Sequence, residues 1–217
     1  MDGDNEPCSE LGTKEYWDKT YQLEINNFQS HGDVGEEWFG EDSAMRVVKW
    51  LNAYEKVTKG SKIIDIGCGN GMLLSLMAEE EYENLLGVDY SQHAINLASS
   101  VANKMALNIS FKVWDILSAE SCPGDVPFDV ALDKGTYDAI GLSSNGAEDR
   151  KTYITKVHSI LTPDGILVLT SCNYTEDELE SQFSERFTKL SRIPAPTFKF
   201  GGREGSLISS LILRKIN

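Results

Sequence analysis

The stretch Ile63-Ile64-Asp65-Ile66-Gly67-Cys68-Gly69-Asn70-Gly71 decides the fold of this chain. Its first half is an apolar run of the kind that forms a buried strand, and its second half is a glycine-rich turn that leads into a helical segment. A strand, a glycine-rich turn and a helix in this order are typical of the place where an α/β sheet binds a nucleotide-like ligand. Glycines let the backbone approach a ligand closely. The free N–H groups that open the next helix favour an anionic group, for which a carboxylate serves as well as a phosphate.

Strand-like and helical segments alternate around this turn. The sequence predicts strands at residues 62–66, 85–88, 109–113, 128–132 and 166–170, and helices at residues 72–81, 92–105, 148–161 and 175–186. Two further strands, residues 187–193 and 207–213, are joined by a loop too short for a helical crossover, which predicts an antiparallel pair. The expected fold is therefore α/β: a Rossmann-like, seven-stranded, mostly parallel sheet with an antiparallel C-terminal strand pair and helices on both faces.

The N-terminal part of the chain precedes this core. Residues 1–12 are polar and acidic, which predicts a disordered tail. Residues 13–61 are expected to form an arm and a helix that pack on the domain, with Asp42-Ser43 as the helix cap and Gly60 as its end. Residues 62–217 complete a single domain. The aromatic anchors of the arm are Tyr16, Trp17, Tyr21 and Phe28.

Composition narrows the function classes. The chain has 217 residues with a formal charge of −14, and a field of that sign repels a nucleic-acid backbone and favours a basic partner. Without a signal-peptide pattern or a membrane-length apolar run, we expect a cytoplasmic or nuclear protein. The cysteines have no metal-ligand spacing, so reduced thiols and no metal site are expected. With no coiled-coil pattern, a monomer is the default expectation. The cysteines are Cys8, Cys68, Cys122 and Cys172.

The spacing of the glycines separates two kinds of cofactor. Nicotinamide and flavin domains usually carry G-x-G-x-x-G, but Met72 stands where the third glycine of that pattern would be. The observed Asp-x-Gly-x-Gly-x-Gly instead resembles motif I of the class I, or seven-β-strand, methyltransferases. This resemblance implies S-adenosylmethionine as the cofactor, with its methionine half gripped by Asp65 and the loop. The loop residues concerned are Gly67, Cys68, Gly69, Asn70 and Gly71.

Two further acids follow the next two strands. In Gly87-Val88-Asp89-Tyr90-Ser91, the carboxylate of Asp89 is placed to accept both hydroxyls of a ribose, with Tyr90 and Ser91 beside it. In Trp114-Asp115-Ile116, the family resemblance implies that the acid binds the adenine amino group and that Trp114 and Ile116 bracket the ring. Each signal alone is equally consistent with a capping aspartate. Their order along one sheet edge favours a cofactor site.

The segment Asp133-Lys134-Gly135-Thr136-Tyr137-Asp138-Ala139 follows the fourth strand at the edge where a transferred methyl group should lie. Asp133, Tyr137 and Asp138 are the candidates to orient an amine or accept its proton. Asp133 is the first candidate, and it is also predicted to contact the cofactor. Capping of the next turn is an equal alternative for Asp133 and the favoured one for Asp138. Lys134 is expected to be a solvated charge. Trp38 and Phe39 are either core anchors or a lid that closes over the cofactor, and the lid is the favoured alternative.

The motifs of amino-methylating nucleic-acid enzymes (Asn/Asp-Pro-Pro-aromatic) and of cytosine C5 enzymes (Pro-Cys) are absent. Several segments closely resemble the elongation factor 1-alpha lysine methyltransferases, which implies methylation of a lysine ε-amine on that factor in the cytoplasm. Two alternatives remain at this point: a small-molecule methyltransferase and a non-catalytic module that binds S-adenosylmethionine. The segments are residues 16–21, 36–42, 65–71, 133–139 and 171–175.

Overall fold

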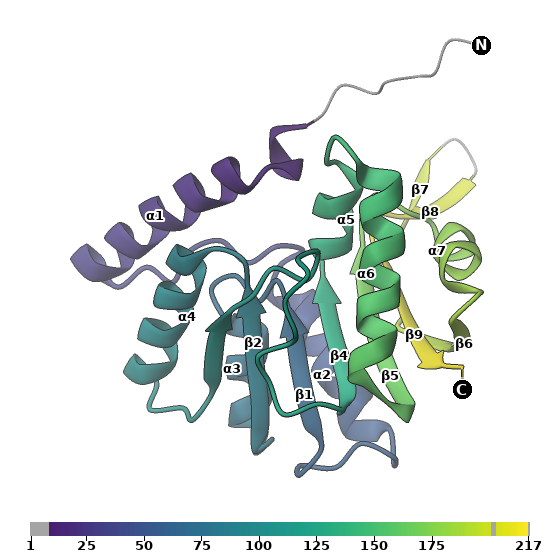
Figure 1. Ribbon diagram of the computed structural model, residues 1–217, viewed down its shortest axis with the longest axis horizontal. Coiled ribbons are helices and arrows are strands. Elements are labelled where there is room, and N and C mark those ends of the chain that lie inside the picture. The colour runs from purple at the N-terminus through teal and green to yellow at the C-terminus, as the bar shows by residue number, and fades with distance from the viewer. Residues whose placement is uncertain (1–8, 201–202, 217) are drawn as a thin grey trace.

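The computed structural model describes residues 9–200 and 203–216. Its centre is a seven-stranded sheet in the order β3-β2-β1-β4-β5-β9-β6 (Figure 1). Strands β1 to β5 pair in parallel, and β9 runs antiparallel to both β5 and β6, which confirms the predicted fold class. The strands are β1 (Lys62–Ile66), β2 (Asn84–Asp89), β3 (Ser110–Val113), β4 (Phe128–Lys134), β5 (Leu161–Ser171), β6 (Phe187–Arg192) and β9 (Ser209–Lys215).

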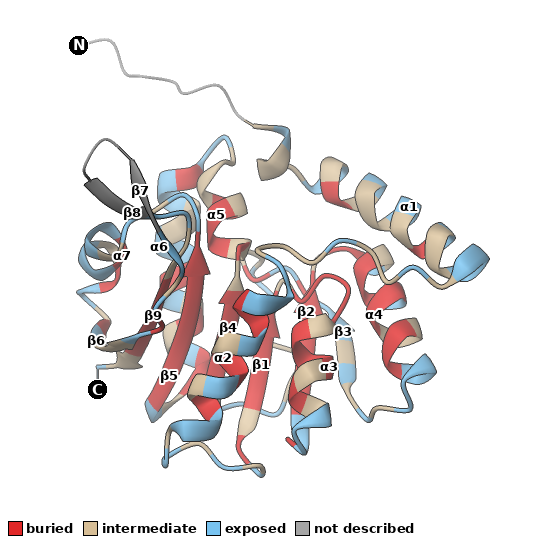
Figure 2. Cartoon of the chain, turned by 180° about the vertical axis from the view of Figure 1, so that it is seen from behind, coloured by how far each residue is buried: buried red, intermediate tan, exposed pale blue. Residues whose placement is uncertain are grey.

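Helices cover both faces of the sheet, as the two opposite views show (Figures 1 and 2). Neighbouring residues of β1 explain this, because side chains alternate between the faces of a strand. Ile63 packs among residues of α2 and α3, whereas Ile64 packs among residues of α5, α6 and α7. The sheet is therefore buried on both sides. The helices are α1 (Lys14–His31), α2 (Glu41–Ala53), α3 (Met72–Glu79), α4 (Gln92–Lys104), α5 (Thr136–Gly141), α6 (Gly146–Ile160) and α7 (Glu176–Phe183).

Helix α1 lies across the carboxyl edge of the sheet, outside the two helical layers (Figure 1). Its aromatic and aliphatic residues recur every three or four positions, which places them on one face. Ile25 packs against Leu97 and Val101 of α4. The hydroxyl of Ser91 donates to Asp18 at 2.6 Å, which ties the helix to the end of β2. The helix therefore walls the edge at which the predicted site residues converge.

The N-terminal predictions need correction. The arm at residues 13–61 contains a helix that was not predicted from the sequence: α1 occupies residues 14–31, because Thr13 caps its start and Gly32, at φ +81°, ends it. A short 3-10 helix, Glu10–Gly12, stands in the predicted disordered tail, and Leu11 accepts a hydrogen bond from the indole of Trp17 at 2.8 Å. Residues 1–8 of that tail lie outside the described residues.

Three other local predictions differ from the structure. Helix α2 begins at Glu41 with Gly40 as its N-cap and ends at Ala53, so Asp42-Ser43 lies inside it rather than capping it. The six-residue α5 was not predicted because so short a segment has no visible helical period. The loop before the last strand contains an antiparallel hairpin of β7 (Thr197–Phe200) and β8 (Arg203–Ser206).

No helix in the described part of the chain is long and apolar enough to cross a membrane. No cluster of three or more potential metal-ligand side chains occurs in residues 9–200 or 203–216. Cys68, Cys122 and Cys172 are free thiols, and Cys8 lies outside the described residues.

Candidate functional site

A cavity of about 160 Å³ opens at the carboxyl edge of the sheet, between the ends of β1, β2 and β4 and the inner face of α1. It lies where an open α/β sheet binds its ligand. The structure brings together ten of the residues predicted for a cofactor, from segments far apart in the sequence. Those that line the cavity are Trp38, Gly67, Cys68, Gly69, Asn70, Asp89, Tyr90, Trp114, Asp115 and Ile116.

The backbone of the glycine-rich loop is held by the protein itself. The N–H groups of Gly67 and Cys68 both donate to the carbonyl of Val88, at 2.8 and 2.9 Å. The N–H of Gly69 donates to a carboxylate oxygen of Asp89 at 3.2 Å, and that of Gly71 donates to the carbonyl of Cys68. These four loop N–H groups therefore already have acceptors within the protein, and the predicted anion site at the N–H groups that open the next helix stays a prediction.

Glycine is required at two positions of the loop by close neighbours. Gly67 has φ +71°, and a Cβ there would overlap the side chain of Thr136, whose hydroxyl donates to the carbonyl of Ile66 at 2.8 Å. Gly69 has φ +53°, and a Cβ there would lie 2.7 Å from the hydroxyl of Tyr21. The loop thus leaves a narrow space under α1 that a side chain would fill.

Asp89 reaches the cavity from the end of β2. One carboxylate oxygen accepts from Gly69 and the other accepts from the N–H of Ser91 at 2.9 Å. Burial raises the pKa of Asp89 to about 6, against the lowering effect of these hydrogen bonds. Each oxygen keeps a further lone pair, so the carboxylate fits the two hydroxyls of a ribose.

The residues after β3 form the far wall. Trp114 and Ile116 are buried in the core beside Tyr137 and line the cavity, while Asp115 between them is exposed. Asp115 accepts from the N–H of Leu117 at 2.9 Å, which fixes its direction. Apolar flanks with an acceptor between them fit an adenine ring and its amino group.

Four residues predicted for the cofactor lie outside the cavity lining. Gly71 is the N-cap of α3, and the hydroxyl of Ser91 is engaged by Asp18 of α1. Asp133 is directed into the core, as described below. Asp65 is 3% exposed and lies beneath the loop, and the described residues give its carboxylate no hydrogen bond. A buried carboxylate without a partner beside a cofactor cavity fits an ammonium group that arrives with the ligand, directly or through water.

Burial raises the pKa of Asp65 to about 7, and the charge of Lys134 lowers it by a smaller amount. The folded protein then binds protons more tightly than the unfolded chain between about pH 4 and pH 7, so stability falls as the pH rises through that range. We expect the ligand-free protein to be more stable against urea at pH 5.5 than at pH 8. Asp65→Asn should reduce that difference and weaken cofactor binding. Asp125→Asn, at an exposed carboxylate, is the control; an equal reduction in both variants would contradict the assignment.

The three predicted catalytic residues do not reach the cavity. Asp133 is 1% exposed, and its carboxylate accepts from the hydroxyl of Tyr153 at 2.5 Å and from the N–H groups of Thr136 and Tyr137 at 3.0 Å each. Burial raises the pKa of Asp133 to about 7. The residue caps the turn into α5, which is the alternative that the sequence left open.

Tyr137 and Asp138 are also turned away from the cavity. Tyr137 is fully buried, and its hydroxyl donates to Gln182 of α7 at 2.5 Å. The carboxylate of Asp138 accepts from the hydroxyl of Ser171 and from the N–H of Cys172, at 2.5 and 2.8 Å. These contacts give both residues a positioning role. Tyr137 joins α5 to α7, Asp138 joins α5 to the end of β5, and other residues of α5 line the cavity.

The arm closes the cavity with aromatic rings. The ring centroids of Trp17 and Trp38 lie 4.9 Å apart, and Tyr21 stacks on Trp17 at 5.9 Å. The carbonyl of Trp38 accepts from Lys134 at 2.8 Å, and Asn70 donates to the carbonyl of Val34 at 3.1 Å. Trp38 therefore lines the cavity, and the arm is held to the core at Lys134 and Asn70.

Sequence reasoning missed several residues that line this cavity. Trp17 and Tyr21 stand four positions apart, which is the spacing of one helical face, so the sequence does contain a signal for them. Lys134 was expected to be solvated, yet it bends inward to the arm. The missed residues are Leu11, Gly12, Trp17, Tyr21, Glu36, Ile66, Leu117, Lys134, Gly135, Thr136, Ala139, Ile140 and Ser143.

The role of Asp89 gives a direct prediction. Asp89→Asn keeps the size of the side chain but replaces one carboxylate oxygen with an NH2 group. This group cannot accept a hydrogen bond from the N–H of Gly69 or from a ribose hydroxyl. We expect affinity for S-adenosylhomocysteine to fall roughly 10- to 100-fold, the effect of losing a hydrogen bond to a charged group. Isothermal titration calorimetry measures it, with Asp125→Asn as the matched exposed control. Unchanged affinity in Asp89→Asn would remove the ribose assignment.

Comparison with known proteins agrees with this geometry. A family described as "Methyltransferase domain" matches residues 57–207. The chain is 40% identical over 210 residues to EEF1A lysine methyltransferase 2 of Homo sapiens, covering 96% of this chain and 88% of the human protein. It is 40% identical over 223 residues to protein-lysine N-methyltransferase efm4 of Schizosaccharomyces pombe, covering 94% and 93%.

Among solved structures, the N-methyltransferase NodS of Bradyrhizobium japonicum, in complex with S-adenosyl-L-homocysteine, has a TM-score of 0.66 at 18% identity, covering 91% of this chain and 99% of that one. This likeness concerns the fold alone. Fold, cavity and family match together define a class I, S-adenosylmethionine-dependent methyltransferase. More narrowly, the chain belongs to the family of lysine methyltransferases that contains EEF1A lysine methyltransferase 2 and efm4.

Proposed function

We propose that the protein transfers methyl groups from S-adenosylmethionine to the ε-amine of a lysine in translation elongation factor 1-alpha. The observation that carries the proposal is the cavity itself, in which Asp89, Asp115 and the glycine-rich loop face a lid of aromatic residues. The family relatives of near-equal length, named for action on this factor or on protein lysine, support the choice of acceptor.

The residues present fit the cofactor in three parts. The glycine-rich loop and the buried carboxylate of Asp65 would hold the amino-acid end, Asp89 the ribose, and Asp115 the adenine amino group. When bound, the cofactor supplies an electrophilic methyl group on a sulfonium, and this chemistry needs no metal.

The protein must present the acceptor lysine as a neutral amine. At pH 7 a free lysine is about 3.4 pH units below its pKa, which corresponds to about 4.6 kcal/mol. The carboxylates of Asp133 and Asp138, which were predicted to be catalytic, do not line the cavity. Proton removal by either residue is therefore not part of this proposal. Instead, the rings of Trp17 and Trp38 exclude water, and desolvation lowers the pKa of an ammonium group.

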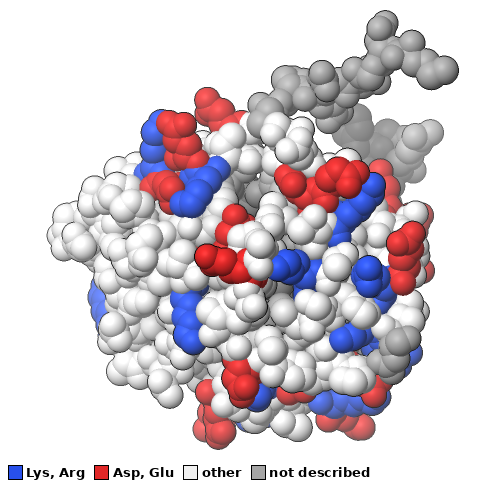
Figure 3. Space-filling model, in the orientation of Figure 1, with Lys and Arg blue, Asp and Glu red and all other residues white. Residues whose placement is uncertain are grey.

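Surface charge supports a protein acceptor over a nucleic acid. On the face shown in Figure 3, basic side chains are interspersed with acidic ones and form no broad basic patch. The formal charge of −14 favours a basic partner surface. We also propose that the enzyme acts as a monomer in the cytoplasm, with the nucleus as a second location. A cytoplasmic location follows from an elongation-factor substrate.

The test is to incubate the protein with tritiated S-adenosylmethionine and a lysate of cells that lack it, and then to map the labelled residue by mass spectrometry. We expect one labelled band at the size of elongation factor 1-alpha, with methyl-lysine at a single position. Asp89→Asn serves as the variant with weakened cofactor binding, and Asp125→Asn as its control. Label confined to small molecules would favour a small-molecule enzyme. Binding of cofactor without any label would favour a non-catalytic module.

A further inference from the structure

Lys134 is the only basic side chain among the described residues that line the cavity. It is the last residue of β4, and it stands between the arm and the glycine-rich loop. The acids of the cavity lining are Glu36, Asp89 and Asp115. The cofactor carries two cationic groups, the amine and the sulfonium, and one anionic group, the carboxylate of its methionine part. The single cation of the cavity therefore matches the single anion of the ligand in sign.

Four backbone N–H groups of the glycine-rich loop and the start of α3 already have acceptors. The N–H groups of Gly67 and Cys68 donate to Val88, and that of Gly69 donates to Asp89. The N–H of Met72, at the start of α3, donates to the side chain of Asn70 at 3.3 Å. An anion at these four positions would compete with acceptors already in place, so a charged donor from another element would add to its binding.

Lys134 has that capacity. Its ammonium group donates to the carbonyl of Trp38 at 2.8 Å, which uses one of its three N–H groups. Among residues 9–197 and 206–216, whose side chains the structure describes, no carboxylate lies within 4.0 Å of its Nζ. The negative charges of Glu37 and Asp65 act on it from farther away. A partly buried cation with no anion in contact is stabilised when an anion joins it.

We propose that Lys134 binds the methionine carboxylate of S-adenosylmethionine. The contact places this carboxylate between the arm and the end of β4, so the same lysine holds the lid and the amino-acid end of the cofactor. The inference rests on the proposed use of this cofactor and adds the residue that recognises its anionic group.

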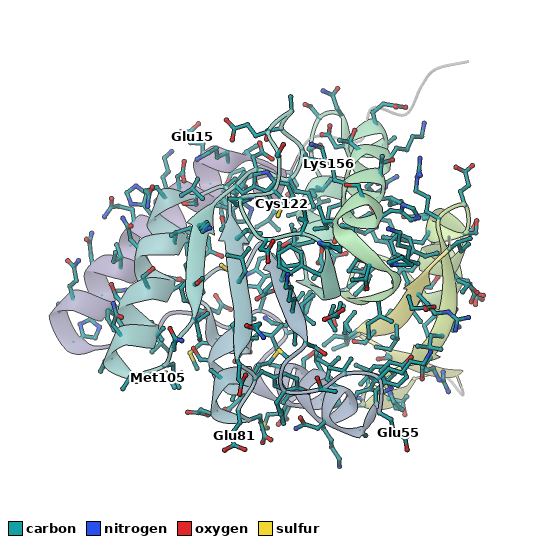
Figure 4. The ribbon with its side chains drawn as sticks, turned by 60° about the horizontal axis from the view of Figure 1, so that its bottom comes forward. Glu15, Glu55, Glu81, Met105, Cys122 and Lys156 are labelled. Atoms are coloured by element: carbon teal, nitrogen blue, oxygen red, sulfur yellow. The ribbon has the colours of Figure 1, made fainter. Side chains whose placement is uncertain are left out.

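The experiment compares two ligands that differ only in that carboxylate: S-adenosylmethionine and decarboxylated S-adenosylmethionine. Lys134→Gln is the main variant, because its amide still donates to the carbonyl of Trp38 but carries no charge. Lys134→Arg restores the charge. The control is Lys156→Gln; Lys156 belongs to α6 (Figure 4) and likewise donates to a backbone carbonyl, that of Glu120, outside the cavity. Dissociation constants are measured by equilibrium dialysis.

We expect the wild-type protein and Lys156→Gln to bind S-adenosylmethionine about 10- to 100-fold more tightly than the decarboxylated ligand, the range for a charge-assisted hydrogen bond. In Lys134→Gln this preference should fall to about twofold or less, and Lys134→Arg should recover part of it. An equal loss for both ligands, or no loss for either, would overturn the inference alone. Failure of the wild-type protein to bind either ligand would overturn the proposed function with it.

Discussion

Gly67→Ala is expected to abolish measurable binding of S-adenosylhomocysteine and to lower the free energy of unfolding by about 2–3 kcal/mol. The added methyl group would overlap Thr136, whose hydroxyl is bonded to the carbonyl of Ile66, and alanine is strained at φ +71°. The strain accounts for about 1–2 kcal/mol and the lost hydrogen bond for about 1 kcal/mol. Urea unfolding and calorimetric titration measure the two effects separately.

Two further variants identify the cause. Gly60→Ala is the matched control, because Gly60 has no positive φ and its nearest contact for a Cβ is Thr58 at 3.9 Å. It should leave binding and stability close to wild type. Combining Gly67→Ala with Thr136→Ala removes two of the three crowded atoms, Oγ1 and Cγ2 of Thr136, and should restore part of the affinity. Normal binding by Gly67→Ala alone would show that the loop moves freely, contrary to the packing described.

Asp133→Ala is expected to lower the free energy of unfolding by about 3–9 kcal/mol, because it leaves three buried or partly buried donors without an acceptor at about 1–3 kcal/mol each. These donors are the hydroxyl of Tyr153 and the backbone N–H groups of Thr136 and Tyr137. The loss is a large fraction of the roughly 5–15 kcal/mol that keeps a domain folded. Chemical denaturation is the measurement, and poor soluble expression is an acceptable form of the same result.

Milder variants separate this structural role from catalysis. Tyr153→Phe removes one of the three hydrogen bonds and should cost about 1–2 kcal/mol while turnover per folded molecule stays within a fewfold of wild type. Asp133→Asn should likewise lose stability more than turnover. If Asp133→Asn instead kept full stability and cofactor binding but lost turnover more than 100-fold, the carboxylate would act on the substrate and the role assigned by the structure would be wrong.

The mostly parallel sheet with its antiparallel C-terminal pair could be predicted because the decisive information is local. Residues 62–66 and the glycine turn mark a strand and a ligand loop, and parallel strands separated by helices leave little freedom in how the sheet is assembled. The acids after β2 and β3 could be placed at the cavity for the same reason: the carboxyl ends of parallel strands share one edge. The role of each acid depends on which strand it follows, and the order of strands and helices along the sequence gives that position.

The direction of individual side chains could not be predicted in this way. Asp133 and Lys134 are adjacent at the end of β4, and successive residues of a strand point to opposite faces. The acid, with the obvious chemistry, turns into the core to meet Tyr153, and the lysine turns to the cavity. Tyr153 stands 20 positions away, on a helix whose rotation about its axis no local pattern fixes. The same limit explains why Ser91 was assigned to the cofactor rather than to Asp18.

Helix α1, in the arm that closes the cavity, buries a smaller share of its residues than any other α-helix of the described chain. Only Trp17 and Ile25 of α1 are buried. Hydrogen bonds between Ser91 and Asp18 and between Lys134 and Trp38 join the arm to residues that stand 73 and 96 positions away in the sequence. Such an element can open as a unit without the sheet unfolding. Amide hydrogens of α1 should therefore exchange with solvent long before those of β1 and β4, and bound cofactor should slow the exchange of the arm most. The residence time of product on the enzyme would then be set by the opening of this helix rather than by the chemistry beneath it.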